Sequence, residues 1–280
     1  MKNTFDKELR YKLYRTVREI LHPTISKKNI SNYKIILDEE LLPVRVFYPQ
    51  KVSNLESITI FIPGDEKITN CPGEYTSILT SFALTYNQLV ITIDYENIKK
   101  EQLNSLYQKV EKTLVYLLNE LIINNIKEDN ITLAGDSTGA SLILYLESKL
   151  KKQLKEILFY PITSGDYFKE TKYSSLESGK LDYDLLPKIT NYYQKRISQE
   201  EINSPNYFYL KNKENKITAK TLIICGGVDP LIDEARNLNN FIPNSRLIEV
   251  PFTGHGFLRS KDRDLIKEYQ LKITEFLKNK

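Results

Sequence analysis

The sequence predicts an α/β fold, in which a mostly parallel β-sheet is covered by helices on both faces. Short runs of β-branched and aromatic residues alternate with segments whose apolar residues recur every three or four positions. Strands separated by helices of this length form right-handed parallel crossovers. At 280 residues, 41% of them hydrophobic, the chain is long enough to bury one sizeable core. We therefore expect a single domain that spans residues 1–280.

Eight segments are predicted to be strands, because they are rich in Val, Ile, Tyr and Phe and are bounded by turn-forming residues. They cover residues 33–37, 43–49, 57–63, 88–95, 130–135, 156–161, 221–227 and 245–251. Only the short segment DEELL separates the first two. We expect these two strands to form a hairpin at one edge of the sheet.

Helical periodicity appears from the third strand onward. It is clearest over 103–121, where Leu106, Val110, Leu114 and Leu117 belong to one apolar stripe. Similar patterns predict helices over residues 73–86, 138–149, 230–242 and 262–278.

Two segments depart from this alternation. Residues 1–32 have an amphipathic helical pattern but precede every strand, and residues 162–219 are far too long for an ordinary connection. Long insertions on such a scaffold serve as lids or binding loops, and the alternative is a helical layer that only packs. The second segment's aromatic residues indicate an aromatic-lined pocket. They include Tyr167, Phe168, Tyr173, Tyr183, Tyr192 and Tyr193.

Composition excludes several classes of protein. No apolar run approaches the roughly 18 residues of a spanning helix, and the charged N-terminus has no apolar signal core. We therefore expect a cytoplasmic protein without membrane or signal segments. The net charge is only +4, with lysines spread along the chain and matched by acids, which argues against nucleic-acid binding.

The few cysteines and histidines do not predict a metal site or a disulfide scaffold. Cys71 and Cys225 are the two cysteines, and with His22 and His255 they lack the close paired spacing of zinc ligands. Cys225 lies in the apolar run TLIIC, where we expect a buried, inert thiol.

A candidate nucleophile lies at the end of the fifth predicted strand. The sequence there is Gly135-Asp136-Ser137-Thr138-Gly139, and a helical pattern follows directly. Glycine makes up only ten of the 280 residues, about half its usual share, so a chance match to Gly-x-Ser-x-Gly is rare. This spacing at a strand-to-helix corner is typical of a nucleophile elbow, in which a sharp turn exposes the serine hydroxyl. The alternative is a glycine-lined tight turn with an incidental serine.

A serine nucleophile needs a base, and the chain has two histidines. His22 precedes Pro23 in the N-terminal segment, where a surface or packing role is expected. His255 lies in PFTGHGFL, just after the last strand, at the carboxyl edge of the sheet where α/β folds bind ligands. We expect His255 to be the base.

An acid must orient the imidazole and stabilise its charged form. Asp229 follows the seventh strand directly, and the chain order Ser137, Asp229, His255 is that of the α/β-hydrolases. Asp233 is the rival candidate, four residues later. Asp94 also ends a strand but precedes the nucleophile strand, so we expect a structural role for it.

Together, the segments GDSTGA, DPLIDEA and GHGF resemble the hormone-sensitive-lipase-like branch of the α/β-hydrolases. The segments VRVFYP, ITIDY and SPNYFYL extend the resemblance from about residue 40 to the C-terminus. It implies an eight-stranded sheet and a helical cap built from residues 1–32 and 162–219. It also implies hydrolysis of carboxylic esters with short or medium acyl chains, without a metal or organic cofactor. This branch often forms dimers, so a homodimer is one state that the resemblance allows, and the sequence itself does not fix the oligomeric state.

The predicted oxyanion loop departs from that branch. Where that branch usually has His-Gly-Gly-Gly, this chain has Phe61-Ile62-Pro63-Gly64-Asp65-Glu66, and the usual YRLAPE is replaced by YENIKKEQ. Oxyanion stabilisation needs backbone N–H donors, which we expect from Gly64, Asp65 and Thr138. An inward-pointing Asp65 carboxylate would repel the oxyanion.

Two functions therefore follow from the sequence. The first is a serine carboxylesterase for small-molecule esters, with Ser137 as nucleophile. The second is a small-molecule-binding protein whose altered oxyanion loop leaves it weak or inactive as a catalyst. Peptide hydrolysis shares the same residues, but no feature of the sequence favours amide substrates.

Overall fold

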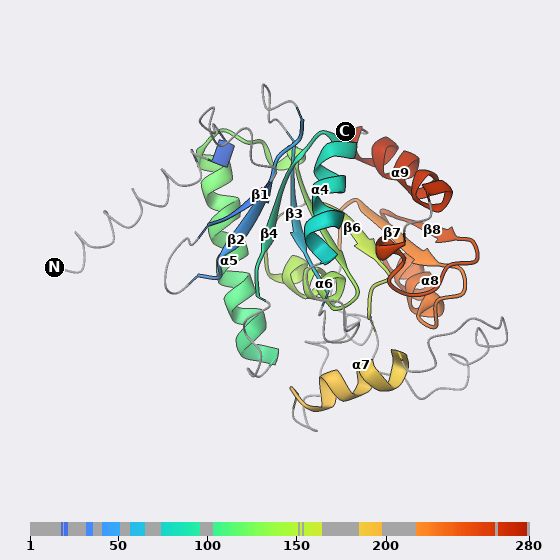
Figure 1. Ribbon diagram of the computed structural model, residues 1–280. Coiled ribbons are helices and arrows are strands. Elements are labelled where there is room, and N and C mark those ends of the chain that lie inside the picture. Colours follow the sequence, from blue (N-terminus) through green and yellow to red (C-terminus); the bar gives the residue numbers. More distant parts are fainter. Residues whose placement is uncertain are drawn as a thin grey trace.

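The computed structural model describes residues 18, 20–21, 32–35, 41–50, 57–64, 74–95, 103–150, 152, 154–163, 185–197, 217–260 and 263–278. Within them it shows the predicted α/β architecture, an eight-stranded sheet in the order β1-β2-β4-β3-β5-β6-β7-β8 (Figure 1). The strands are β1 (Asn32–Ile35), β2 (Val44–Phe47), β3 (Ile58–Ile62), β4 (Leu89–Ile93), β5 (Ile131–Asp136), β6 (Lys155–Phe159), β7 (Thr221–Gly226) and β8 (Ser245–Val250). All eight predicted strands are confirmed.

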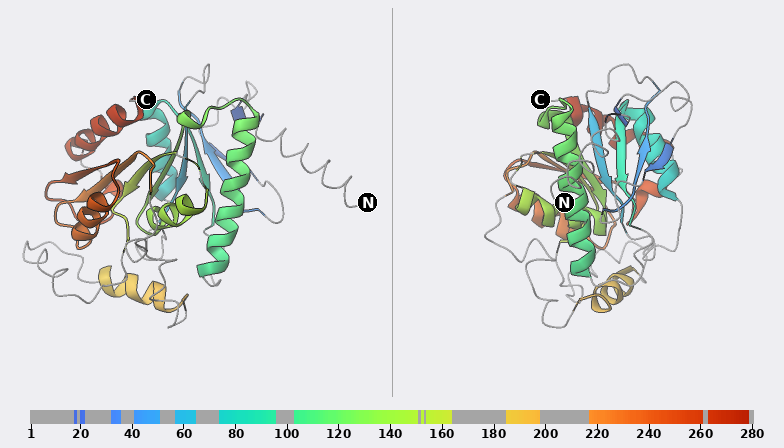
Figure 2. Two further views of the ribbon diagram at one scale, coloured as in Figure 1. Left: turned by 180° about the vertical axis from the view of Figure 1, so that it is seen from behind. Right: turned by 90° about the vertical axis from the view of Figure 1, so that its left-hand side faces the viewer.

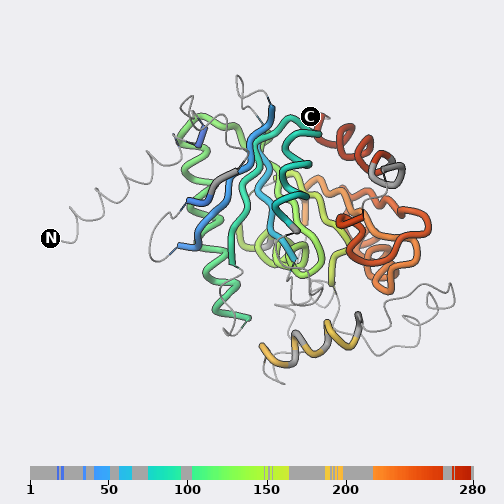
Figure 3. Tube along the Cα trace, viewed as in Figure 1, coloured from blue at the N-terminus to red at the C-terminus, as the bar shows by residue number. Residues whose placement is uncertain are grey.

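The sheet is antiparallel only at its N-terminal edge. β1 and β2 pair antiparallel, as the hairpin prediction required, and β2 pairs antiparallel with β4. Every other neighbouring pair is parallel. The chain therefore fills one half of the sheet with β1–β4 and the other half with β5–β8, as the colour gradient in Figure 3 shows.

Five helices confirm the periodicity of the sequence. They are α4 (Glu74–Tyr86), α5 (Leu103–Ile123), α6 (Thr138–Leu150), α8 (Ile232–Phe241) and α9 (Arg263–Lys278). Helices α4 and α9 cover one face of the sheet, and α5, α6 and α8 cover the other (Figures 1 and 2). Two short 3-10 turns, η1 (Glu128–Asn130) and η6 (Phe257–Arg259), were not predicted. None of these described helices is long and apolar enough to cross a lipid bilayer.

Helix α7 (Leu185–Gln194) lies beyond the carboxyl ends of the strands (Figure 1). Its Ile189 and Tyr193 side chains are buried, and the Leu103 N–H at the start of α5 donates to the Arg196 carbonyl at 3.1 Å. This is the central part of the insertion expected over residues 162–219. Most of that insertion and most of residues 1–32 lie outside the described residues, so their role as a cap stays a prediction.

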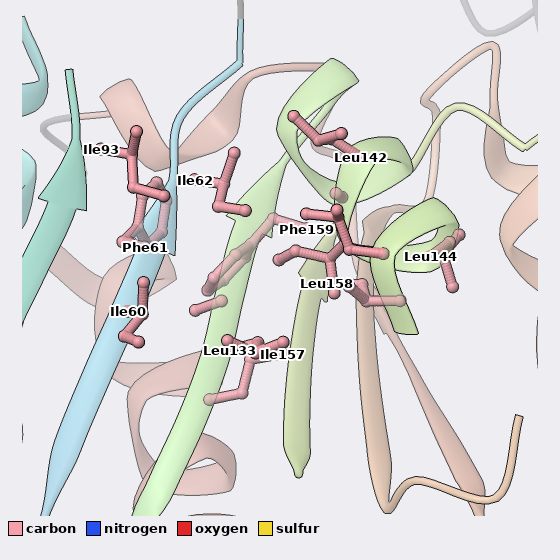
Figure 4. Close-up of a cluster of buried hydrophobic side chains, with 14 of the residues drawn as sticks. Ile60, Phe61, Ile62, Ile93, Leu133, Leu142, Leu144, Ile157, Leu158 and Phe159 are labelled. Carbon is pink, nitrogen blue, oxygen red and sulfur yellow. The ribbon is translucent and has the colours of Figure 1, made fainter. Parts of the chain in front are cut away.

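The central strands are buried on both faces, and their sequences are therefore continuous apolar runs instead of alternating apolar and polar residues. All five residues of β3 and all six of β5 are buried. Side chains of β3, β5, β6 and α6 belong to one buried hydrophobic cluster, in which Figure 4 labels Ile60, Leu133, Ile157 and Leu142. This rigid layer fixes where each strand ends, and so where the following loops begin.

Two carboxyl groups lie close together at the opposite end of the sheet from those loops. Glu156, at the start of β6, is fully buried, and the Thr221 hydroxyl donates to it at 3.2 Å. Burial, and then the charge of Glu147 on α6, raise the pKa of Glu156 well above its usual value. Burial raises the pKa of Glu147 to about 7, although backbone N–H groups of Thr218 and Ala219 donate to it. Folding therefore favours the protonated form of both groups.

This pair predicts that stability falls as pH rises. A carboxyl group whose folded pKa exceeds its unfolded pKa binds more protons in the folded state, so the free energy of unfolding decreases between those two values. For Glu147 this interval runs from about 4.5 to about 7. Urea unfolding should show that Glu147→Gln loses less stability than the wild type between these pH values, by on the order of 2 kcal/mol once solvent screening of the partly exposed Glu147 is allowed for.

The exposed Glu275 on α9 provides the control for this comparison. Glu275→Gln should keep the wild-type pH dependence. An unchanged pH dependence in Glu147→Gln would contradict the prediction.

Candidate active site

Ser137 occupies the sharp turn between β5 and α6 that the sequence predicted. Its φ is +51°, a left-handed value that costs a non-glycine residue on the order of 1 kcal/mol. Its backbone N–H donates to the Phe159 carbonyl at 2.9 Å, which ties the turn to the end of β6. The neighbouring sheet therefore holds this strained conformation in place.

The two glycines of the motif allow the chain to cross β3 closely. A Cβ atom on Gly139 would lie 2.1 Å from the Ile62 carbonyl oxygen, and one on Gly135 would lie 2.8 Å from the same atom. Both distances are well inside van der Waals contact. The first turn of α6 can approach the end of β3 only because these positions carry no side chain.

The structure brings Ser137, His255 and Asp229 into one hydrogen-bonded chain. The Ser137 Oγ atom lies 3.1 Å from Nε2 of His255, and Nδ1 of His255 lies 2.9 Å from Oδ2 of Asp229. The other Asp229 oxygen accepts the Leu231 N–H at 2.8 Å. The side chains of His255 and Asp229 are only 2% and 0% exposed. Because an ionised carboxylate only accepts, this geometry places a proton on Nδ1 and leaves Nε2 to accept from the serine.

The rival candidates lie elsewhere. Asp233 is partly exposed and pairs with Arg236 at 3.1 Å. Asp94 pairs with Lys34 at 2.8 Å and lies 3.7 Å from Arg45, so it joins β4 to the antiparallel edge strands, as a structural role predicts. His22 lies outside the described residues.

Asp136, which precedes Ser137, forms a buried hub that the sequence reasoning missed. Its carboxylate is 1% exposed and accepts the Gly64 N–H at 2.8 Å, the Tyr75 hydroxyl at 2.8 Å and the Tyr160 hydroxyl at 3.1 Å. Arg259, four residues after His255, donates to the Tyr75 hydroxyl at 3.3 Å. A charged residue inside the apolar end of β5 was the one signal in the sequence for this hub.

The hub corrects one prediction, the assignment of Gly64 as an oxyanion donor. The Gly64 N–H points at Oδ1 of Asp136, so it is committed to that carboxylate instead of to a substrate oxygen. Thr138 is the first residue of α6, in the position of the donor that follows a nucleophile. Asp65 lies outside the described residues.

The two tyrosines of the hub remain donors at any ordinary pH. Burial, followed by the charge of Asp136, raises the pKa of both the Tyr75 and Tyr160 hydroxyls well above the usual value. Each therefore keeps its proton and can stabilise the Asp136 carboxylate continuously.

Cys225 is buried, as predicted, in β7 beside Asp229. Burial and the charge of Asp229 raise the pKa of its thiol well above the usual value, so it has little of the thiolate that nucleophilic chemistry needs. Among the described residues, no group of three or more His, Cys, Asp or Glu is placed to bind a metal ion.

A protein-family model with the description alpha/beta hydrolase fold matches residues 68–259, which is more than half of the chain and includes Ser137, Asp229 and His255. This chain belongs to the α/β-hydrolase family. The match also confirms the resemblance to the hormone-sensitive-lipase-like branch. No curated protein sequence matches the chain.

Solved structures share this α/β-hydrolase fold. A structure from the analysis of two fungal esterases from Rhizomucor miehei matches with a TM-score of 0.75 at 17% sequence identity, and the match covers 95% of this chain and 90% of that chain. A hyperthermophilic esterase from the archaeon Pyrobaculum calidifontis gives 0.73 at 16% identity, covering 97% and 92%. Carboxyl esterase 2 from Tuber melanosporum gives 0.73 at 17% identity, covering 89% and 88%.

The loop that carries Asp229 and the loop that carries His255 cross each other closely at Gly226. A Cβ atom at Gly226 would lie 2.2 Å from the Thr253 carbonyl oxygen, whereas one at Gly254 would meet no atom within 4 Å. Urea unfolding of Gly226→Ala should show a loss on the order of 2 kcal/mol, because the two loops must move apart.

Gly254→Ala, in the same loop pair, is the matched control. Its stability should stay equal to the wild type or rise by up to about 1 kcal/mol, because alanine lowers the entropy of the unfolded chain. Equal stability of Gly226→Ala and Gly254→Ala would show that the crossing does not constrain the site.

Proposed function

We propose that this α/β-hydrolase is a serine carboxylesterase that cleaves small-molecule esters through an acyl-enzyme. The observation that carries this proposal is the continuous hydrogen-bonded chain from Ser137 through His255 to the buried Asp229. The esterases named among the similar structures give the proposal further support. Residues 1–32 and 162–219 would form the cap and restrict the acyl group to short or medium chains.

Acylation begins when Oγ of Ser137 attacks the ester carbonyl carbon. Nε2 of His255 takes the serine proton as the new C–O bond forms, and Asp229 stabilises the resulting imidazolium. The tetrahedral intermediate then collapses, the bond to the alcohol breaks, and His255 returns the proton to the departing oxygen. The acyl group stays on Ser137 as an ester.

Deacylation repeats these steps with water. His255 takes a proton from the attacking water, and the acid is released as the proton returns to Ser137. The backbone N–H groups of Thr138 and Asp65 would hold the oxyanion in both halves of the reaction. Each such donor contributes roughly 100- to 1,000-fold to the rate.

The bond between Gly64 and Asp136 also favours a second function. The Gly64 N–H donates to Asp136, so the loop has one N–H donor fewer for an oxyanion. A protein with this loop could bind a small ligand without turning it over. The two functions differ in hydrolysis of short p-nitrophenyl esters. A binding protein would show no rate above that of Ser137→Ala.

The esterase proposal predicts that a fluorophosphonate probe labels the wild-type protein and does not label Ser137→Ala. His255→Ala should lose at least about 10,000-fold in kcat on p-nitrophenyl esters, because the serine then lacks its base. In-gel fluorescence and steady-state kinetics measure the two effects.

His22→Ala is the control, because it removes the other histidine of the chain. It should keep the wild-type rate and labelling. Equal labelling of wild type and Ser137→Ala, or equal loss in both histidine variants, would refute the proposed mechanism.

A further inference from the structure

Tyr160 makes contact with two parts of the site at once. It is the first residue after β6 and is fully buried. Its ring lies against the imidazole of His255, with 4.6 Å between ring centroids and 58° between planes. Its hydroxyl donates to Oδ2 of Asp136 at 3.1 Å. One side chain therefore joins the base to the carboxylate hub behind the nucleophile.

The backbone of Tyr160 adopts a conformation that is unfavourable for its type. Its φ is +37°, in the left-handed region that a bulky residue rarely adopts, at a cost of about 1–2 kcal/mol. Its N–H donates to the Ile224 carbonyl at 2.7 Å, which fixes the turn against β7. Glycine or asparagine would adopt this turn more easily, so the strain indicates that the tyrosine side chain itself is needed here.

The surroundings leave Tyr160 little freedom. Phe257, two residues after His255, packs edge-on against its ring at 5.1 Å between centroids. Asp136, which holds the Tyr160 hydroxyl, also holds the Gly64 N–H at the start of the predicted oxyanion loop. The Tyr160 ring thus has a fixed position relative to both the His255 loop and the β5 turn.

From these contacts we propose that Tyr160 is a positioning residue that holds the His255 ring in line with Ser137. Asp229 fixes the imidazole at Nδ1, but this bond alone would leave the ring free to turn about it and carry Nε2 away from Ser137. The Tyr160 ring packs on the imidazole and removes this freedom, while Asp136 holds the tyrosine. The inference rests on the proposed esterase function, because it assigns the means by which the base is aligned.

The test compares Tyr160→Phe and Tyr160→Leu with the wild type. Tyr160→Phe keeps the ring on His255 and loses only the hydroxyl, whereas Tyr160→Leu loses the ring. Hydrolysis of p-nitrophenyl butyrate should show kcat reduced about 100-fold in Tyr160→Leu, with KM little changed, because misplacing a catalytic group by about 1 Å costs this much. Tyr160→Phe should lose less than about tenfold.

The rate of fluorophosphonate labelling gives a second readout, because Ser137 attacks the probe with the help of the same base. It should fall in Tyr160→Leu by the same factor as kcat. Rates are normalised to the folded fraction of each sample from urea unfolding. If Tyr160→Leu does not fold, Tyr160→Met gives the same comparison, because its longer, flexible side chain adapts better to the space that the ring leaves.

Phe47→Leu is the matched control for a lost aromatic ring, because Phe47 is fully buried in β2, away from the site. It should lose stability but keep the wild-type kcat per folded molecule. A Tyr160→Leu protein with wild-type kcat per folded molecule, or with a change in KM alone, would overturn the role of Tyr160. A wild type without labelling or turnover would instead refute the esterase function and, with it, this role.

Discussion

The site of this α/β-hydrolase depends on one buried charge, the carboxylate of Asp136. A carboxylate that is 1% exposed is stable only if donors replace its lost water, and uncompensated burial costs several kcal/mol. Gly64, Tyr75 and Tyr160 supply these donors from three different parts of the chain. Satisfying this one group brings together the end of β3, helix α4 and the turn after β6, all around the residue that precedes Ser137.

The topology explains why the other loops also converge there. Strands β3 to β8 are parallel, so the segments after β5, β7 and β8 leave the sheet at the same edge. Those segments carry Ser137, Asp229 and His255. Close backbone crossings at Gly139 and Gly226 then bring the chain nearer than side chains would permit. The three residues can form a hydrogen-bonded chain because the strands that carry them are parallel and because glycines at the crossings let the backbone segments approach closely.

The fold and the three central residues could be predicted because each leaves a local signal. The spacing of the apolar residues predicts the strands and helices. The glycines around Ser137 and the scarcity of histidine limit the candidates for a nucleophile and a base. The role of Asp136 could not be predicted, since its partners Gly64, Tyr75 and Tyr160 lie far apart in sequence and meet only in the folded chain. For the same reason the sequence assigned the Gly64 N–H to a substrate oxygen, although Asp136 accepts it.

Trapping the acyl-enzyme during turnover shows whether Ser137 carries the acyl group. The protein is mixed with p-nitrophenyl butyrate, quenched in acid during turnover, digested and mapped by mass spectrometry. We expect a butyryl group on the peptide that contains Ser137. Turnover without any acylated peptide, or with the acyl group on a different residue, would contradict it.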